Sequence, residues 1–309
     1  MSKIKNIAVI GAGLMGHGIA QVFTVKGYQV VLMDMEKGIL DTAVNNIRSN
    51  LTLMADNNII RYEDIESSIQ NIHTTTDMKE ATGEADFVVE AILENLELKQ
   101  KTFKELDGLC GPKTILATNT SVISITEIAE KSINRDRIVG THFWNPPYLI
   151  PLVEVVRGRD TSDNAMNDTI TLLEKVGKHP VRVNKDVPGF VGNRLQHALW
   201  REAISIVEKG IADASTVDEC IKYGFGLRLP VLGPLENTDM VGTDLIFSIH
   251  NYILRHLENS PEPSILLKNA VENGYLGFKT NQGLQKWSPE DVKESRKRLL
   301  EYLLKVTRK

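Results

Sequence analysis

The feature that most constrains the fold is a glycine-rich turn that directly follows a short apolar run. Ile7–Ile10 predicts a buried strand, and the next six residues read Gly-Ala-Gly-Leu-Met-Gly before a helix-like segment begins. In this G-x-G-x-x-G pattern the first glycine permits a tight turn, the second lets the backbone approach a pyrophosphate, and the third lets the helix pack close to the strand. Free N–H groups at the helix N-terminus bind phosphate oxygens. We therefore expect a pyrophosphate site formed by Gly11, Gly13, Leu14, Met15 and Gly16.

An acidic residue ends the next predicted strand. The apolar run at residues 28–33 is followed by Asp34. A carboxylate at this place accepts hydrogen bonds from the ribose hydroxyls of NAD and repels the 2′-phosphate of NADP. Because strand, glycines, helix, second strand and terminal acid occur together in one short unit, the pattern is far more specific than the glycines alone. The sequence therefore predicts NAD as the cofactor.

The alternation of helical and strand patterns continues beyond Asp34, as a doubly wound parallel sheet requires. The apolar pattern predicts further strands at 85–92, 114–118, 138–142, 152–156 and 180–183. It predicts helices at 38–54, 94–109 and 162–176, and a second helical element at 55–68 that breaks at Asn57 and Asn58. The fold class is therefore α/β, with an N-terminal Rossmann-type doubly wound sheet.

From Val187 onward the β-branched runs disappear and helical periods replace them. These periods predict helices at 193–209, 237–257, 264–273 and 289–305, and one more that is capped by Ser215. Pro188 and Gly189 mark the joint between the two patterns. We therefore expect an NAD-binding Rossmann domain at 1–187 and a C-terminal all-helical domain at 188–309, with a ligand in the cleft between them.

The composition argues against several classes of protein. Among 309 residues, 42% are apolar and the net charge is −4, without the basic patch of a nucleic-acid-binding protein. No apolar stretch reaches membrane-spanning length, and because residues 1–5 lead directly into the first predicted strand, we expect no signal peptide. Cys110 and Cys220 lie far apart without metal-ligand spacing. We therefore expect a cytoplasmic protein with two reduced, partly buried thiols, no metal, and no nucleic-acid or membrane partner.

Two residues that could carry chemistry lie in neighbouring predicted strands. His142 ends one apolar run, and Glu154 lies within the next, between Val153 and Val155. A histidine that removes the proton of an alcohol while hydride leaves the same carbon needs a carboxylate to hold its tautomer and stabilise the imidazolium. A buried carboxylate in turn needs a partner. By spacing alone, a hydrogen-bonded core histidine is as good an interpretation as a catalytic one.

Six motifs, in order along nearly the whole chain, resemble those of the L-3-hydroxyacyl-CoA dehydrogenase family. They are Gly11–Gly16, Val89–Asn95, Ala117–Ser121, His142–Pro146, Leu152–Val155 and Pro188–Arg194. Residues 233–242 and 276–280 resemble the signatures of the family's helical domain. The resemblance implies an NAD-dependent 3-hydroxyacyl-CoA dehydrogenase of fatty acid metabolism that forms a homodimer through its helical domain.

The resemblance also implies roles for individual residues. His142 would be the general base for oxidation of the alcohol, and Glu154 would orient it. Ser121 and Asn193 would hydrogen-bond the oxygen atoms of the substrate and polarise its carbonyl in the reverse direction. Without the resemblance, both residues would be interpreted as helix caps. The implied contacts to the cofactor in this half of the domain are Ala91, Glu94, Lys99, Asn119, Ser121 and Asn145.

Three positions depart from the family pattern or bear on the substrate. Members that act on CoA thioesters usually carry a lysine near Asn58, where it can meet a CoA phosphate, and a second lysine where this chain has Pro151. Residues 145–154 instead resemble the branch of lambda-crystallin and L-gulonate dehydrogenase, whose members oxidise free hydroxy acids. Arg228 could grip a substrate carboxylate with two hydrogen bonds. A surface arginine that lies along apolar side chains is an equally good interpretation.

Two classes of function stay open. The leading hypothesis is a dehydrogenase of a short-chain 3-hydroxyacyl-CoA such as 3-hydroxybutyryl-CoA, with a free hydroxy acid, similar to L-gulonate or carnitine, as the close competitor. The other class is a crystallin-like NAD-binding protein without activity. The intact set of His142, Glu154, Ser121 and Asn193 argues against this second class.

Overall fold

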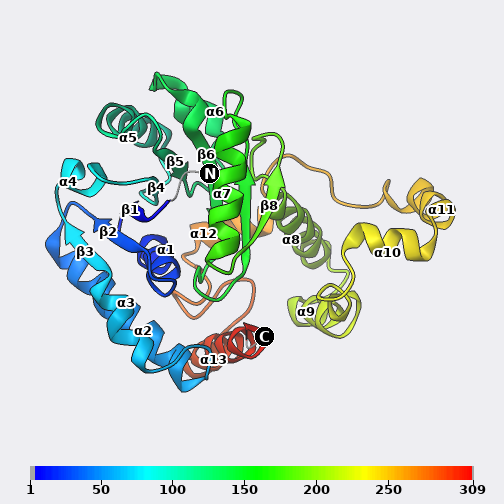
Figure 1. Ribbon diagram of the computed structural model, residues 1–309. Coiled ribbons are helices and arrows are strands. Elements are labelled where there is room, and N and C mark those ends of the chain that lie inside the picture. Colours follow the sequence, from blue (N-terminus) through cyan, green and yellow to red (C-terminus); the bar gives the residue numbers. More distant parts are fainter. Residues whose placement is uncertain (1–3, 308–309) are drawn as a thin grey trace. The chain divides into compact units, whose positions relative to one another are not determined.

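The N-terminal part of the chain forms an eight-stranded sheet in the computed structural model, which describes residues 4–307 (Figure 1). The strands are β1 Asn6–Ile10, β2 Gln29–Met33, β3 Ile72–Thr75, β4 Phe87–Glu90, β5 Ile115–Thr118, β6 Ile138–Phe143, β7 Leu152–Val156 and β8 His179–Val183. Their order is β3-β2-β1-β4-β5-β6-β7-β8, and all neighbours pair in parallel except β6 and β7. The predicted doubly wound sheet is confirmed, with its reversal of strand order between β1 and β4, where such sheets bind ligands.

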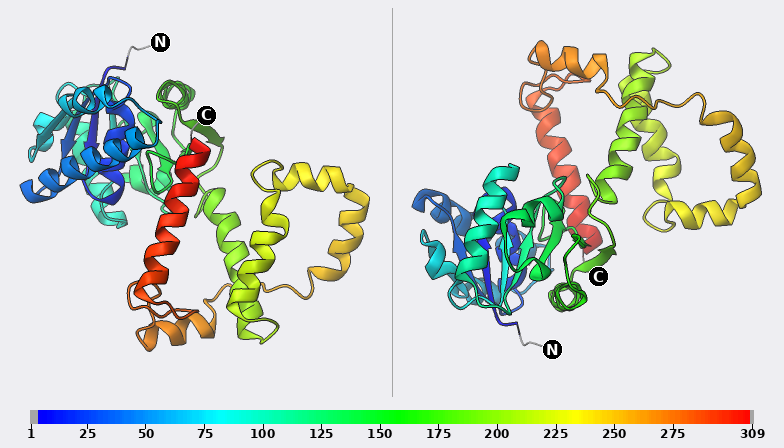
Figure 2. Two further views of the ribbon diagram at one scale, coloured as in Figure 1. Left: turned by 90° about the horizontal axis from the view of Figure 1, so that it is seen from below. Right: turned by 90° about the horizontal axis from the view of Figure 1, so that it is seen from above.

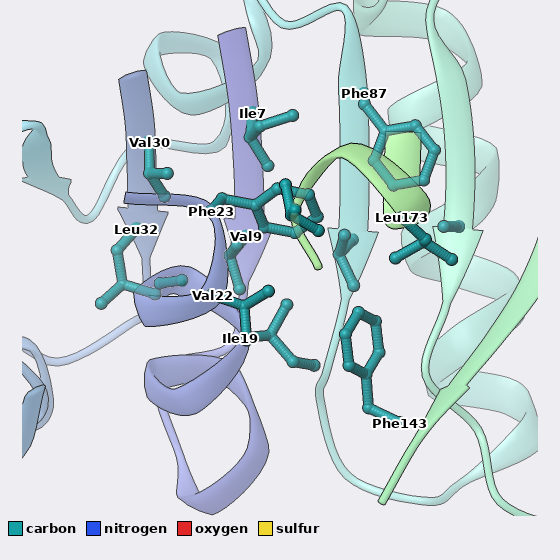
Figure 3. Packing of buried hydrophobic residues seen from close by; sticks show 14 of the residues in the cluster. Ile7, Val9, Ile19, Val22, Phe23, Val30, Leu32, Phe87, Phe143 and Leu173 are labelled. Atoms are coloured by element: carbon teal, nitrogen blue, oxygen red, sulfur yellow. The ribbon is translucent and has the colours of Figure 1, made fainter. Parts of the chain in front are cut away.

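Two apolar clusters cover the two faces of this sheet. Alternate residues of a strand point to opposite faces, so Ile7 and Val9 of β1 belong to one cluster and Ala8 and Ile10 to the other. Figure 3 shows Phe23 packed among the strand residues of the first cluster. Parallel strands with both faces buried need helices on both sides. These helices are α1 Leu14–Thr24, α2 Lys37–Asp56, α3 Glu63–Gln70, α4 Met78–Thr82, α5 Leu96–Leu109, α6 Ile125–Ile128 and α7 Asp163–Lys175.

The rest of the chain is helical, as expected. Its helices are α8 Gly192–Glu208, α9 Ala214–Tyr223, α10 Pro234–Val241, α11 Thr243–Ile253, α12 Ile265–Glu272 and α13 Pro289–Thr307. Figure 2 shows α9, α10 and α11 following one another in an arc rather than as a packed bundle. No helix within residues 4–307 is long and apolar enough to cross a lipid bilayer.

The chain falls into two compact units. One comprises Met1–Arg194 with Leu300–Lys309, and the other comprises Leu195–Leu299. The first unit therefore includes the first residues of α8 and the last turns of α13. This division differs from the domain boundary expected after residue 187, which stays a prediction.

Local structure differs from the sequence-based expectations at four places. The helix expected at 237–257 is two helices, α10 and α11, separated at Gly242, whose φ of +103° ends a helix. Asp213 rather than Ser215 caps α9, because its side chain accepts from the N–H of Thr216. Strand β3 was not expected, since only Thr75 in it is buried and the apolar pattern is absent. Cys220 is exposed, so the expectation of a partly buried thiol is wrong there.

Candidate active site

The glycine-rich turn joins β1 to α1 in the conformation that its glycines require. Gly11 has a φ of +99°, and a Cβ atom there would lie 2.6 Å from the carbonyl oxygen of Ala91. A Cβ atom on Gly16 would lie 1.7 Å from the carbonyl oxygen of Gly11. At Gly13, no atom lies within 4 Å of the position that a Cβ atom would take. The turn is therefore closely packed against the sheet and open at the glycine to which the fingerprint assigns the pyrophosphate.

Groups that can bind the phosphates and a ribose of a dinucleotide surround this turn. Gly13 is the N-cap of α1 and has no side chain to cap it, which leaves the N–H groups of the first turn for phosphate oxygens. Asp34 at the end of β2 accepts the N–H groups of Ala12 and Met35, each at 2.8 Å. Because a carboxylate has about four acceptor sites, Asp34 keeps lone pairs for ribose hydroxyls. The residues present fit NAD.

His142 and Glu154 form a buried hydrogen-bonded pair. The two residues lie opposite each other in the antiparallel pairing of β6 and β7. Nδ1 of His142 lies 2.7 Å from Oε2 of Glu154, and the residues are only 4% and 1% exposed. The other carboxylate oxygen accepts the backbone N–H groups of Val191 at 2.9 Å and Gly192 at 3.0 Å. The pairing of neighbouring strands thus brings the two candidate catalytic residues together.

The environment of Glu154 keeps its carboxylate ionised. Burial by itself would raise the pKa of Glu154, but the hydrogen bonds from His142, Gly192 and Val191 outweigh it, and the pKa lies below its usual value. An ionised carboxylate only accepts, so Nδ1 of His142 carries the hydrogen and Nε2 is left as an acceptor. Nε2 has no hydrogen-bond partner within residues 4–307. In its neutral form, the imidazole therefore presents Nε2 as the nitrogen that can take a proton.

Two aromatic rings flank the imidazole. The ring centroids of Trp144 and Phe190 lie 5.3 Å and 5.8 Å from that of His142. A Cβ atom at Gly192 would lie 2.5 Å from Cζ2 of Trp144 and 3.3 Å from Oε2 of Glu154. Only glycine therefore fits between the indole and the carboxylate. Packing and hydrogen bonding together restrict the orientation of His142.

Ser121 and Asn193 are also brought together, although they are far apart in the sequence. The side-chain amide of Asn193 donates to the carbonyl oxygen of Ser121 at 3.0 Å. Ser124 rather than Ser121 caps α6, since its hydroxyl accepts the N–H of Glu127. The alternative interpretation of Ser121 as the cap of α6 is therefore wrong. Its role toward a substrate stays a prediction, as does that of Asn193.

The other expected cofactor residues surround the carboxyl ends of β4 and β5. Lys99 is 1% exposed, and its ammonium group lies 2.6 Å from Glu90 and 3.3 Å from Glu94. Asn119 uses its side-chain oxygen to accept the N–H of Phe143 at 2.9 Å. Asn145 is exposed in the connection after β6. Their contacts to NAD stay predictions.

Arg228 lies in the other compact unit, directly after a short 3₁₀ helix at Phe225–Leu227. The residue is exposed. Within residues 4–307 its guanidinium group makes no hydrogen bond or ion pair. It is therefore unpaired in the part of the chain that the structure describes.

The groups that hold the site residues in place were not predicted from the sequence. Glu90 is fully buried at the end of β4, and the N–H groups of Val191 and Gly192 bind Glu154. A charged residue at the end of an apolar strand was a usable signal for Glu90. No sequence signal marks the two backbone groups, because any residue carries an N–H group.

Comparison with known proteins assigns both parts of the chain to one family. Residues 6–187 match the 3-hydroxyacyl-CoA dehydrogenase NAD binding domain, and residues 189–287 match the 3-hydroxyacyl-CoA dehydrogenase C-terminal domain. A probable 3-hydroxybutyryl-CoA dehydrogenase of Bacillus subtilis is 39% identical over 282 residues, which are 91% of this chain and 96% of that protein.

Another relative is named for a different substrate. The 5-formyl-3-hydroxy-2-methylpyridine 4-carboxylate 5-dehydrogenase of Mesorhizobium japonicum is 33% identical over 290 residues, 94% of this chain and 93% of that protein. A crystal structure of a 5-dehydrogenase for the same pyridine carboxylic acid, described as an NAD⁺-dependent dismutase, has a TM-score of 0.91 and 33% identity. It covers 99% of this chain and 98% of that one.

The relatives are oxidoreductases, which sets aside the alternative of an inactive crystallin-like protein. The matches, the glycine-rich turn and Asp34 all assign NAD as the cofactor. By both of its domains, the chain belongs to the 3-hydroxyacyl-CoA dehydrogenase family of NAD-dependent oxidoreductases.

Proposed function

We propose that this chain interconverts a small hydroxy acid and the corresponding keto acid, with His142 as the general base. The buried hydrogen bond of 2.7 Å between His142 and Glu154 carries the proposal. Nε2 takes the proton of the substrate hydroxyl, and Glu154 stabilises the imidazolium that forms. NAD⁺, when bound, accepts the hydride from the same carbon. Ser121 and Asn193 hydrogen-bond the substrate oxygen, which in the reverse reaction develops negative charge.

The connection between α2 and α3 favours a free acid over a CoA thioester. The resemblance implies that thioester enzymes place a lysine here to meet a CoA phosphate, and this chain has Asn58. The basic side chain in residues 55–70 is Arg61, which forms ion pairs with Glu63 and Asp64. An acidic surface whose cation is already paired repels phosphate. The acids of this segment are Asp56, Glu63, Asp64 and Glu66, of which Glu66 pairs with Arg48 of α2.

The last turns of α13 cover the apolar part of the same connection. Leu300, Leu303 and Leu304 pack in one cluster, and Oγ1 of Thr307 lies 3.3 Å from the carbonyl oxygen of Leu149. Apolar surface that the chain itself buries is not available to a long substrate tail. This packing supports a compact substrate. The partners of the three leucines are Leu53, Met54, Ile59, Ile60, Tyr148 and Leu149.

The relatives divide between the two substrate classes. The Mesorhizobium japonicum relative is named for a free pyridine carboxylate, which supports the free acid. The Bacillus subtilis relative is named for 3-hydroxybutyryl-CoA, so a short-chain thioester is the second candidate. A location in the cytoplasm and a place in fatty acid metabolism stay predictions.

An NADH-oxidation assay separates these two candidates. We expect faster turnover with acetoacetate or another free keto acid than with acetoacetyl-CoA, each at millimolar concentration. In this proposal Arg228 binds the carboxylate of the free acid. Arg228→Ala should therefore lower kcat/KM for the free acid by about ten- to a hundredfold, because a charge-assisted hydrogen bond contributes about 1.5–3 kcal/mol.

The matched control is Lys222→Ala, which removes an exposed cation of α9 that pairs with Asp218. It should leave kcat/KM unchanged. If acetoacetyl-CoA is the better substrate and Arg228→Ala has no effect, the free-acid proposal is wrong and the thioester takes its place.

A second copy of the chain is the partner that we propose for the helical unit. Between Leu195 and Leu299 only Ser205, Ala270 and Val292 are buried. Large apolar side chains such as Phe247, which is 68% exposed, lie on its surface instead. A unit without its own apolar core gains little stability by folding alone. Burial of these faces in a homodimer supplies the missing core.

Light scattering after size exclusion should therefore give twice the chain mass of 34.5 kDa. Because dimerisation stabilises the folded state by mass action, the midpoint of urea unfolding should rise with protein concentration. A monomer whose midpoint is independent of concentration would refute the homodimer.

A further inference from the structure

A charge cluster with a buried centre, Glu90 and Lys99, and one exposed member, Glu94, lies at the carboxyl ends of β4 and β5. The ammonium group of Lys99 lies 2.6 Å from Oε1 of Glu90 and 3.3 Å from Oε2 of Glu94. Glu90 is fully buried, and its other oxygen accepts the hydroxyl of Thr118 at 2.6 Å. Two carboxylates thus share one buried lysine. Such a group is costly to bury unless its hydrogen bonds are well satisfied.

Glu94, the outermost member of this cluster, binds the loop that carries Ser121. Oε1 of Glu94 accepts the hydroxyl of Thr120 at 2.5 Å, the N–H of Ser121 at 2.9 Å and the N–H of Val122 at 3.2 Å. Burial by itself would raise the pKa of Glu94, but the hydrogen bond from Thr120, the charge of Lys99 and the two backbone N–H groups lower it below the usual value. The loop is therefore anchored on an ionised carboxylate.

Ser121 is held from both sides of its own backbone. Glu94 accepts its N–H, and the side chain of Asn193 donates to its carbonyl oxygen at 3.0 Å. In doubly wound sheets the second set of strands, here β4 and β5, serves the second mononucleotide half of the dinucleotide. The loop thus lies where hydride transfer would take place.

We propose that Glu94 is a positioning residue for Ser121, held in turn by Lys99 and Glu90. This inference rests on the proposed role of Ser121 toward the substrate. Misplacement of a substrate-binding group by about 1 Å costs about a hundredfold in rate, and the hydroxyl of Ser121 moves with the backbone that Glu94 anchors. The ammonium group of Lys99 lies within reach of both carboxylates and offsets their mutual repulsion.

The positioning role is separate from the cofactor contact that the family resemblance implies for Glu94, and kcat at saturating NADH distinguishes the two. Glu94→Ala removes the acceptor of three hydrogen bonds and should lower kcat by about ten- to a hundredfold. Affinity for NADH, measured by fluorescence without substrate, reports any contact of Glu94 with the cofactor, so kcat is compared at saturating NADH. Glu94→Gln keeps an oxygen that accepts from the loop, so it should recover most of kcat.

A double-mutant cycle with Ser121→Ala tests the proposal, with acetoacetate or acetoacetyl-CoA as substrate, whichever turns over faster. In the Ser121→Ala background, Glu94→Ala should cost less than about threefold, because the group it positions is already gone. Losses in kcat that multiply independently would overturn the proposal. If Ser121→Ala itself retains full activity, the assignment of Ser121 fails instead. The control is Glu97→Ala, an exposed acid in the first turn of α5, which should change neither quantity.

Discussion

The His142→Gln variant is expected to fold and to bind NADH but to lose about 10²–10⁴-fold in kcat, because positioned general acid–base catalysis contributes a factor of this size. The side-chain amide of glutamine can donate to Glu154 in place of Nδ1. It therefore keeps the carboxylate partnered but provides no base at the position of Nε2. Initial rates of NADH oxidation give kcat, and fluorescence titration gives the affinity for NADH.

The control for this variant is His179→Gln. His179 is exposed on β8 of the same sheet, so its replacement should leave kcat unchanged. A His142→Gln enzyme with near-native kcat would show that another group takes the proton. A variant that has also lost NADH binding would point to a structural effect rather than to the loss of a base.

Replacement of the partner carboxylate is expected to reduce activity almost as much, by about 10²–10⁴-fold in Glu154→Gln. The amide oxygen of glutamine can still accept from the N–H groups of Val191 and Gly192. The amide nitrogen then faces Nδ1 of His142 and donates to it, so Nδ1 becomes the acceptor. The hydrogen moves to Nε2, and the imidazole presents a donor where the substrate needs an acceptor. Measurement of kcat for this variant, beside that for His142→Gln, checks the result.

Glu154→Ala separates the catalytic role from the structural one. It leaves the part-buried N–H groups of Val191 and Gly192 without this acceptor, at a cost of up to about 1–3 kcal/mol each, so urea unfolding should show a lower stability than in Glu154→Gln. The pKa of Glu154 is lower in the folded chain than its usual value, so its stabilising effect is complete above about pH 4.3 and is lost as the pH falls through the lowered pKa. The stability difference between wild type and Glu154→Gln should therefore shrink only under acid. If Glu154→Gln retained wild-type kcat, the proposed tautomer control would be wrong.

The cofactor half of the site could be predicted residue by residue because its requirements are local. Gly11 and Gly16 contact each other's backbone within a single turn, and Asp34 ends the very next strand. The residues of the catalytic half of the site could be predicted only as candidates. His142 and Glu154 were equally well explained as a core pair, since spacing along the chain does not determine which strands become neighbours.

The sequence by itself determined the βαβ unit, the preference for NAD, the all-helical second part and the candidate pair of His142 and Glu154, because turn chemistry and apolar periodicity act over a few residues. Only the tertiary structure decided what those residues contact. It assigned two backbone N–H groups to Glu154 and buried Lys99 between two carboxylates. It also paired Arg61 with its neighbouring acids and left the helical unit without a core. Hydrogen bonds, ion pairs and burial depend on which segments meet in space, and in this chain the pairing of strands and the docking of loops decide that.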